Sequence, residues 1–411
     1  MPSVSSITRG RSPLNDRMLR VSCDAVAGGS PPEHLWIDYP PELDPFLDAS
    51  GNPWAILLLP TAVVRGEPLD IELPVDSRLL DNLHALQQAW ASWYDWAQAV
   101  PINAERSGDS PSSTQRHAGR ESALFFTGGV DSLFSLIRHD ASDARSEAAE
   151  APLSLVTIHG FDISLANESE FEKVESLCSE IAGMTGSSSI PLATNLRAID
   201  GYGRSWGPLS HAAALAGIGH LFSGRFGRLI IGSTRDHDHL SPWGSHPSTD
   251  PLFSSHDVEV VHDGAEHTRV EKTRALLDRK DLVGKLRVCW KGGGADNCSR
   301  CAKCLRTMVT IDLYGEQDAV ASFDWTEYGL DRVAEVYLAT ESYANYFQEI
   351  RDAAAVEGRN DIVEAIDRSI ARSARRRRLQ QPVQRMLKDL VSHRSLRPIY
   401  QRINRGGRTH R

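Results

Sequence analysis

The feature that most constrains the fold is an alternation of short apolar runs with amphipathic stretches between residues 121 and 290. The apolar runs are SALFF, LSLVTIHG, SIPLAT, RLIIGS, VEVVHD and KLRVCW. Most of the stretches between them have the spacing of helices. Strands that alternate with helices pair in parallel, and the helices then cover both faces of the sheet. We therefore predict an α/β fold on a parallel sheet, with a ligand site beyond the carboxyl ends of the strands.

A glycine loop lies between the first of these strands and the helix that follows it. Within LFFTGGVDSLF its residues are Thr127, Gly128, Gly129, Asp131 and Ser132. Glycines let backbone N–H groups approach a ligand, and a helix start adds donors and partial positive charge, so the segment suits phosphate. The spacing is neither a Walker loop nor a dinucleotide fingerprint. A tight turn with an Asp or Ser helix cap is the structural alternative.

Four of the six cysteines are clustered in the sequence. Cys289, Cys298, Cys301 and Cys304 have the spacing C-x8-C-x2-C-x2-C. Four thiolates complete a closed tetrahedral site, so we predict a structural zinc knuckle with four cysteine ligands over residues 289–304. An iron–sulfur cluster also takes four cysteines and is the alternative metal group.

The glycine loop resembles the S-G-G-x-D-S pyrophosphate-binding loop of the PP-loop ATP pyrophosphatase superfamily. One departure is Thr127, which replaces the leading Ser and keeps its hydroxyl. With the cysteine spacing included, residues 122–315 resemble the 7-cyano-7-deazaguanine synthase family, with extra N- and C-terminal regions. The resemblance implies a Rossmann-like sheet of the adenine nucleotide alpha hydrolase-like kind.

That family activates a carboxylate with ATP, releases pyrophosphate, accepts ammonia to form an amide and dehydrates the amide to a nitrile. The resemblance implies an ATP-dependent carbon–nitrogen ligase with Mg²⁺, a small-molecule or macromolecular carboxylate acceptor, and ammonia. It places the phosphates of ATP on Thr127, Gly128, Gly129, Asp131 and Ser132. It places His159 and Asp162 near the adenine. The catalytic candidates are Asp131, Ser132, Arg269 and Lys272, of which the last two are assigned by position only.

The loop after RLIIGS departs from that family. Where the family has a Tyr-Pro-Asp-Cys-Arg-like segment, this chain reads HLSPWGSHPSTD. Trp243 is suited to stack on a planar substrate, and Arg235, His237 and Asp250 are suited to hydrogen-bond it, although each also suits an ordinary loop. The changed loop predicts the same activation chemistry with a different acceptor. A specialised relative is therefore favoured over housekeeping queuosine biosynthesis.

Two other functions fit the same motifs. A PP-loop amidotransferase acting on a sugar or a peptide would form an amide or amidine instead of a nitrile. A non-catalytic nucleotide- or RNA-binding adaptor would keep the loop and use the basic tail, and Thr127 in place of Ser favours it. Cys23 and Cys178 carry no persulfide motif, which disfavours a tRNA thiolase.

Composition divides the chain into four parts. Residues 1–118 form an accessory α+β region that ends in a Ser-, Gly- and Pro-rich linker. Residues 119–316 hold the glycine loop and the cysteines in a nucleotide-binding domain. Residues 317–370 have a helical pattern, and residues 371–411 form a basic tail with the composition of a flexible segment.

The net charge of −9 conceals two opposite regions. Residues 368–411 carry a net charge of +13, which leaves −22 on residues 1–367. Such a tail favours a nucleic acid or an acidic protein as partner, or is a solvated appendage. No apolar run reaches the roughly 18 residues of a membrane helix, and the N-terminus lacks a secretory signal. We expect a cytoplasmic protein, with a homodimer as one open oligomeric state.

Overall fold

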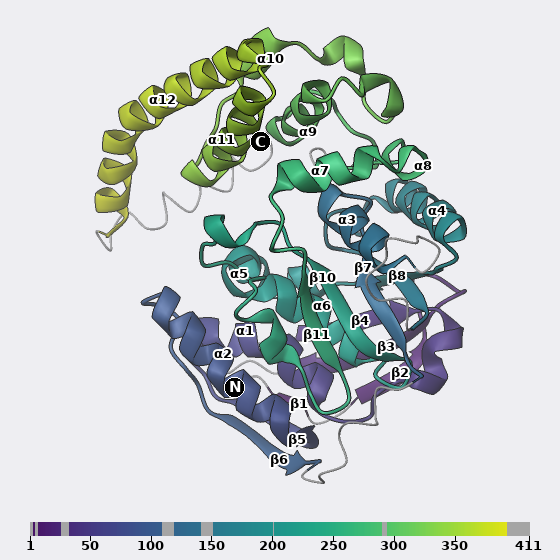
Figure 1. Ribbon diagram of the computed structural model, residues 1–411. Helices are drawn as coiled ribbons and strands as arrows, with labels where there is room; N and C mark the ends of the chain where they lie inside the picture. The colour runs from purple at the N-terminus through teal and green to yellow at the C-terminus, as the bar shows by residue number, and fades with distance from the viewer. Residues whose placement is uncertain are drawn as a thin grey trace. The chain divides into compact units, whose positions relative to one another are not determined.

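The structure is a computed structural model that describes residues 3–4, 7–25, 33–108, 119–140, 151–199, 201–289 and 294–392. The chain forms two compact units. The first contains residues 1–298 and 316–324, and the second contains residues 299–315 and 325–411. The first combines strands with helices, and the described part of the second is helical (Figure 1).

The first unit is built on an eight-stranded sheet with the strand order β11-β10-β7-β8-β9-β4-β3-β2. Five strands are mutually parallel: β7 (Glu121–Phe125), β8 (Leu153–His159), β9 (Ser188–Thr194), β10 (Phe226–Gly232) and β11 (Glu259–Asp263). In β7, Leu124 pairs with Leu155 of β8 and with Ile230 of β10. All three side chains are fully buried, as in a strand covered on both faces. The predicted α/β fold with a mostly parallel sheet is confirmed.

The N-terminal region extends the same sheet. Its three strands are β2 (Ile7–Arg11), β3 (Leu19–Ala25) and β4 (Glu33–Tyr39). They form an antiparallel meander, and β4 joins β9 in antiparallel pairing at Ile37 and Thr194. The Thr194 hydroxyl donates to the Trp36 carbonyl at 2.7 Å and reinforces the junction. The sequence analysis did not predict this continuation, because strand partners far apart in the chain leave no local signal.

Helices cover both faces of the parallel part of the sheet (Figure 1). One face carries α3 (Val130–His139) and α4 (Glu168–Thr185), with α7 (Arg269–Leu277) packed against α3. The other face carries α6 (His211–His220), against which α1 (Asn52–Arg65) packs. Two glycines let α6 pack closely between α1 and β10. A Cβ at Gly217 would lie 2.5 Å from Cγ of Leu57 in α1. A Cβ at Gly219 would lie 2.4 Å from Cδ1 of Leu229 in β10, so larger residues would force these layers apart.

A second, three-stranded parallel sheet has the order β1-β5-β6. Its strands are β1 (Ser3–Val4), β5 (Leu69–Asp76) and β6 (Ile102–Ser107). The first unit also contains the helices α2 (Ser77–Trp93), α5 (Tyr202–Ser205) and α8 (Lys280–Val283). Asp76 caps α2 by accepting a hydrogen bond from the Leu79 N–H at 3.0 Å. The same carboxylate lies 2.9 Å from Nδ1 of His256, which ties α2 to the segment before β11.

The second unit contains α9 (Ala302–Leu313), α10 (Leu330–Glu335), α11 (Glu341–Val356) and α12 (Asn360–Ser392). Arg359, just before α12, donates through Nη1 to the Asp312 carbonyl of α9 at 2.9 Å. Tyr328 donates its hydroxyl to the Asp312 carboxylate at 2.7 Å. Asp312 therefore joins three segments of this unit. Among the described residues, no helix combines the length and the apolar character needed to cross a membrane.

The predicted strand KLRVCW does not form over its described residues, so this prediction was wrong. The Arg287 N–H donates to the Gly128 carbonyl at 2.8 Å. The N–H groups of Val288 and Cys289 donate to the Asn297 side-chain oxygen at 2.8 and 3.1 Å. The backbone N–H groups of this segment therefore bind the glycine loop and the Asn297 side chain instead of a neighbouring strand.

Candidate functional site

The glycine loop lies where the chain reverses its direction across the sheet. From β7 the chain moves outward to β8 and β9, and it then returns to the other side of β7 to form β10 and β11. The carboxyl ends of β7 and β10 therefore lead into opposite faces of the sheet, an arrangement that leaves a crevice for a ligand. The glycine loop follows β7 and leads into α3, and Ser233 follows β10.

The conformation of the loop depends on its two glycines. Gly128 has a φ of +72°, which favours glycine, and Gly129 caps α3 with extended backbone. The Thr127 N–H donates to the Ser132 hydroxyl at 3.4 Å, and that hydroxyl donates to the Gly129 carbonyl at 3.2 Å. The first N–H groups of a helix have no partner within the helix. A loop closed in this way can present them to an anion.

The structure brings together the four predicted catalytic residues, which come from α3 and α7. Nη1 of Arg269 lies 2.7 and 2.8 Å from the two carboxylate oxygens of Asp131. Only 7% of the Arg269 side chain and 20% of the Asp131 side chain are exposed. Ser132 neighbours Asp131 on α3, and Lys272 lies one helical turn after Arg269 on α7. A part-buried ion pair, in which one guanidinium nitrogen contacts both carboxylate oxygens, thus holds Arg269 beside the glycine loop.

Lys272 places a second cation in the same region. Its Nζ donates to the carbonyl of Ser233, the first residue after β10, at 2.6 Å. Burial lowers the pKa of Lys272 below its ordinary value, and the charge of Asp131 opposes that shift. Because burying an ammonium group is costly, an anion bound at the loop would stabilise its charged form.

The residues predicted to lie near the adenine follow β8. The His159 ring stacks on Phe171 with a centroid distance of 4.4 Å, and its Nε2 lies 2.9 Å from the Ser164 carbonyl. That nitrogen must be the donor, because a carbonyl only accepts. Burial lowers the pKa of His159, so the ring is held neutral and packs as part of the core. Asp162 is exposed on the loop after β8.

The four predicted substrate residues do not form one cluster of exposed groups. Arg235 donates to the His239 carbonyl at 3.0 Å within its own loop, and the His237 side chain is exposed. Trp243 is 48% exposed and covers Gly207, where a Cβ would lie 2.6 Å from the indole ring. Asp250 is fully buried.

The sequence analysis missed His262, which is the partner of Asp250. Its Nδ1 lies 2.7 Å from Asp250 Oδ2, and the Ser245 hydroxyl donates to the same oxygen at 2.7 Å. The carboxylate accepts from Nδ1, so it selects the tautomer whose Nε2 is an acceptor. That Nε2 is buried and has no hydrogen-bond partner in the described part of the chain. The signal in the sequence was a histidine at the carboxyl end of the predicted strand VEVVHD.

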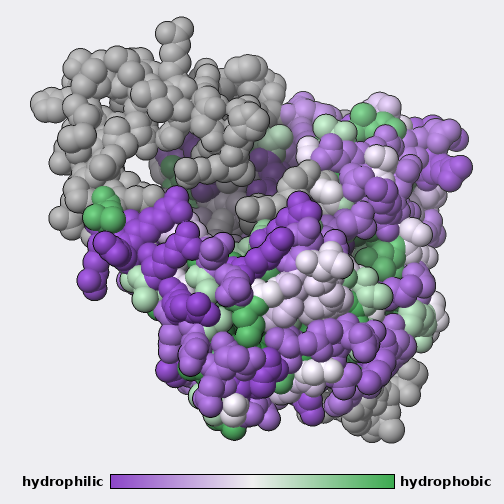
Figure 2. All heavy atoms as spheres, turned by 90° about the horizontal axis from the view of Figure 1, so that it is seen from above, coloured by the Kyte–Doolittle hydropathy of each residue, from purple (hydrophilic) through white to green (hydrophobic). Residues whose placement is uncertain are grey.

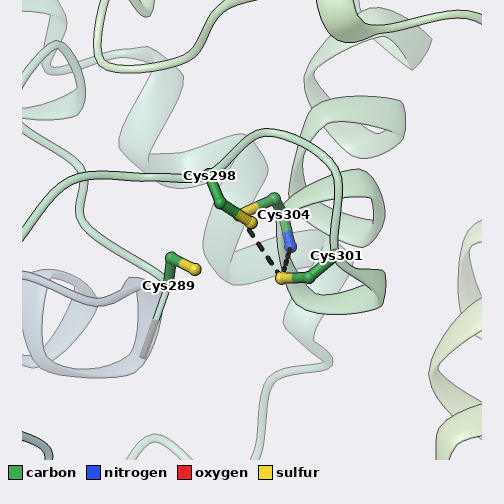
Figure 3. Close-up of side chains that lie close together, drawn as sticks. All are labelled: Cys289, Cys298, Cys301 and Cys304. Carbon is green, nitrogen blue, oxygen red and sulfur yellow. Dashed lines mark hydrogen bonds between the residues drawn. The ribbon is translucent and has the colours of Figure 1, made fainter. Parts of the chain in front are cut away.

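The four predicted metal ligands come together. The sulfur atoms of Cys289, Cys298, Cys301 and Cys304 all lie within 4.8 Å of one another (Figure 3). The Cys301 and Cys304 sulfurs are 3.6 Å apart. A Zn–S bond of about 2.3 Å implies sulfur–sulfur distances of roughly 3.8 Å in a tetrahedron. The cluster can therefore hold a metal ion such as zinc.

A buried arginine connects the glycine loop with the residues that precede Cys298. The Arg287 guanidinium donates to the Ala295 and Gly294 carbonyls at 3.0 and 3.4 Å, and to the Thr127 carbonyl at 3.5 Å. From α4, Glu170 accepts a hydrogen bond from the Ala295 N–H at 2.7 Å. Asn297, next to Cys298, accepts hydrogen bonds from the Val288 and Cys289 N–H groups and so joins the two ends of the segment 288–297. Local sequence could not reveal this link, because the two ends lie far apart in the chain.

No protein-family model, curated protein or solved structure matches this chain. The glycine loop, two buried cations and a carboxylate make a region suited to an anion and its counter-cation. The four thiols make a separate region suited to a soft metal ion.

Proposed function

We propose that this chain is an ATP-dependent adenylating enzyme of the PP-loop, 7-cyano-7-deazaguanine synthase type. The observation that carries the proposal is the glycine loop at the reversal point of the sheet, with Arg269 and Lys272 beside it. A single phosphate-binding turn would not need two buried cations from a distant helix. Pyrophosphate carries concentrated negative charge and would need such cations.

In the first step, an oxygen of the acceptor carboxylate attacks the α-phosphorus of ATP, and the bond from that phosphorus to the β-phosphate oxygen breaks. Charge develops on the departing pyrophosphate. The loop N–H groups, the hydroxyls of Thr127 and Ser132 and the cation of Lys272 would stabilise that charge. Asp131 would hold the Mg²⁺ that accompanies the phosphates, and Arg269 would orient Asp131 through their ion pair.

In the second step, ammonia attacks the activated carbonyl carbon, AMP leaves with the electrons of its bond to that carbon, and an amide forms after loss of a proton. The amide oxygen would then attack the α-phosphorus of a second ATP, and a second pyrophosphate would leave. Loss of AMP and two protons would give a nitrile. Zinc in the cysteine cluster has no part in these steps, since four thiolates leave no open position on the ion. Its role would be structural.

The decisive experiment follows the fate of α- and γ-labelled ATP in the presence of Mg²⁺, ammonia and a panel of carboxylates. The first carboxylate is the precursor from which the deazaguanine family makes its nitrile. We expect AMP and pyrophosphate, formed only when an acceptor is present. Formation of ADP and phosphate would contradict the proposal, because the wrong bond would have broken. Nucleotide binding without AMP formation with any acceptor would favour an adaptor instead.

Two matched variants test the assignment. Ser132→Ala removes a hydroxyl from the loop, and Ser179→Ala removes an exposed hydroxyl from α4 on the same face of the sheet. We expect AMP formation to fall by about 100- to 1000-fold in the first variant, the range for one lost transition-state donor, and to be unchanged in the second. Equal activity in the two variants would remove Ser132 from the site. Mass spectrometry of the product separates amide from nitrile.

A further inference from the structure

The long helix α12 has two chemically different faces. One face is buried in the second unit and contains Ile362, Ala365, Ile366, Ser369 and Ser373. Hydrogen bonds hold this face against residues 336–338: the Ser369 hydroxyl donates to the Val336 carbonyl at 2.9 Å, and Ser373 Oγ accepts from the Leu338 N–H at 2.9 Å. The orientation of the helix within its unit is thereby set.

An exposed face of the helix, next to the buried one, carries arginines. Arg368, Arg372 and Arg375 are exposed and follow i, i+4 and i+7 spacing, so they lie on one side of the helix. We refer to these three residues as the arginine stripe. A rise of 1.5 Å per residue places its members roughly 4.5–6 Å apart along the axis. Arg376 and Arg378 flank the stripe and are also exposed.

Within the described part of the second unit, the charge of the stripe is not neutralised by ion pairs. The acids of α12 before Arg368 lie in its first turns, and two of the three have arginine partners. Asp361 pairs with Arg359 at 2.8 Å and Asp367 with Arg351 at 2.9 Å. After Asp367, the next acid in the sequence is Asp389. In the described part of the chain, no ion pair involves a member of the stripe.

We propose that the arginine stripe binds the phosphate backbone of a nucleic acid. Guanidinium groups match phosphate oxygens through paired N–H donors, and a row of them along a helix matches a polymer with regularly spaced charges better than a single anion. The coloured part of the face seen in Figure 2 is mostly hydrophilic, with apolar side chains in small, separate areas. This inference is independent of the proposed ATP chemistry.

The test measures binding of fluorescein-labelled oligouridine to the full-length chain by anisotropy over about 50–300 mM KCl, a range in which phosphate contacts are strongly salt-dependent. A parallel titration with labelled duplex DNA shows which form of nucleic acid the chain prefers. In the variant Arg368→Gln/Arg372→Gln/Arg375→Gln, loss of three contacts should reduce the slope of log K against log salt by about 2. Affinity at about 150 mM salt should fall roughly 50-fold.

The matched control is Arg9→Gln/Arg11→Gln/Arg17→Gln, which removes the same charge from exposed positions of the first unit. Thermal unfolding checks that both variants fold. The proposal is supported if only the stripe variant loses affinity and salt slope. It is overturned if the control loses as much, if the native chain does not bind either nucleic acid, or if polyglutamate competes as well as oligouridine, which would identify an acidic protein as the partner.

Discussion

At the scale of single residues, the candidate site depends on charges held where water cannot fully solvate them. Lys272 is 1% exposed and Arg269 7% exposed, yet each has its own anchor: a backbone carbonyl for Lys272 and a carboxylate for Arg269. Removing either side chain would alter the charge beside the loop. The pKa of Lys272 makes this arrangement sensitive to pH.

Nucleotide affinity should fall at alkaline pH because of Lys272. Burial lowers the pKa of this ammonium group, so its proton leaves at a lower pH than that of an ordinary lysine. As pH rises through that lowered pKa, affinity for a labelled ATP analogue should decrease by up to about tenfold per pH unit. Lys272→Met should bind weakly at all pH values, with no such decrease.

Lys280→Met is the control for this effect. Lys280 is an exposed lysine of α8 that pairs with Glu316 at 3.0 Å. This variant should keep the affinity and the pH profile of the native chain. A decrease that persists in Lys272→Met would show that another group titrates, and Lys272 would then have no electrostatic role in binding.

At the scale of elements, the glycine loop and α4 use glycine for different reasons. Gly128 has a positive φ and joins β7 to α3, with its carbonyl bonded to the Arg287 N–H. Gly183 lies in the last turns of α4, where a Cβ would meet no other atom within 4 Å. The same substitution should therefore have opposite effects on stability at the two positions.

Gly128→Ala should lower the free energy of unfolding by about 1–2 kcal/mol, the cost of a left-handed conformation for an L-residue. Gly183→Ala should raise it by about 0.5–1 kcal/mol through helix propensity. Urea titrations of both variants measure these changes. If Gly128→Ala were as stable as the native chain, the loop would not have the conformation described, and its fit to an anion would fail with it.

At the scale of the whole molecule, two classes of cysteine should be distinguishable. Burial raises the pKa of Cys23 to about 12 and that of Cys178 to about 11, so these thiols resist modification in the folded state. The four clustered cysteines should react with a thiol reagent once a chelator has removed the metal, before unfolding exposes the other two.

The measurement combines metal analysis of the purified chain with thiol counting before and after chelation. We expect one zinc per chain and four thiols released with it, whereas iron with labile sulfide would identify the alternative cluster. Simultaneous reaction of all six thiols would contradict a folded chain with a local metal site. The variant Cys178→Ser should leave the metal content unchanged.

Much of this organisation could be predicted from the sequence, for physical reasons that also explain the failures. Apolar runs that alternate with amphipathic stretches revealed β7 to β11, and short-range cysteine spacing revealed the cluster. The pairing of Ile37 with Thr194, the bridge of Arg287 and the dyad of Asp250 with His262 depend on tertiary contacts. Asp250 was predicted as a substrate residue because a sequence does not show that a loop carboxylate is buried.

The Arg287 bridge has a consequence for the order in which the chain acquires its structure during synthesis. The glycine loop is made early, but the backbone and guanidinium that support it belong to a segment made about 160 residues later. A nascent chain that ends between Asp263 and Arg287 has all five parallel strands and still lacks the support behind Gly128. Long-range closure of this kind is slow compared with local helix formation. The sheet can therefore assemble first, and the glycine loop takes its final form only after the segment that contains Arg287 has been made.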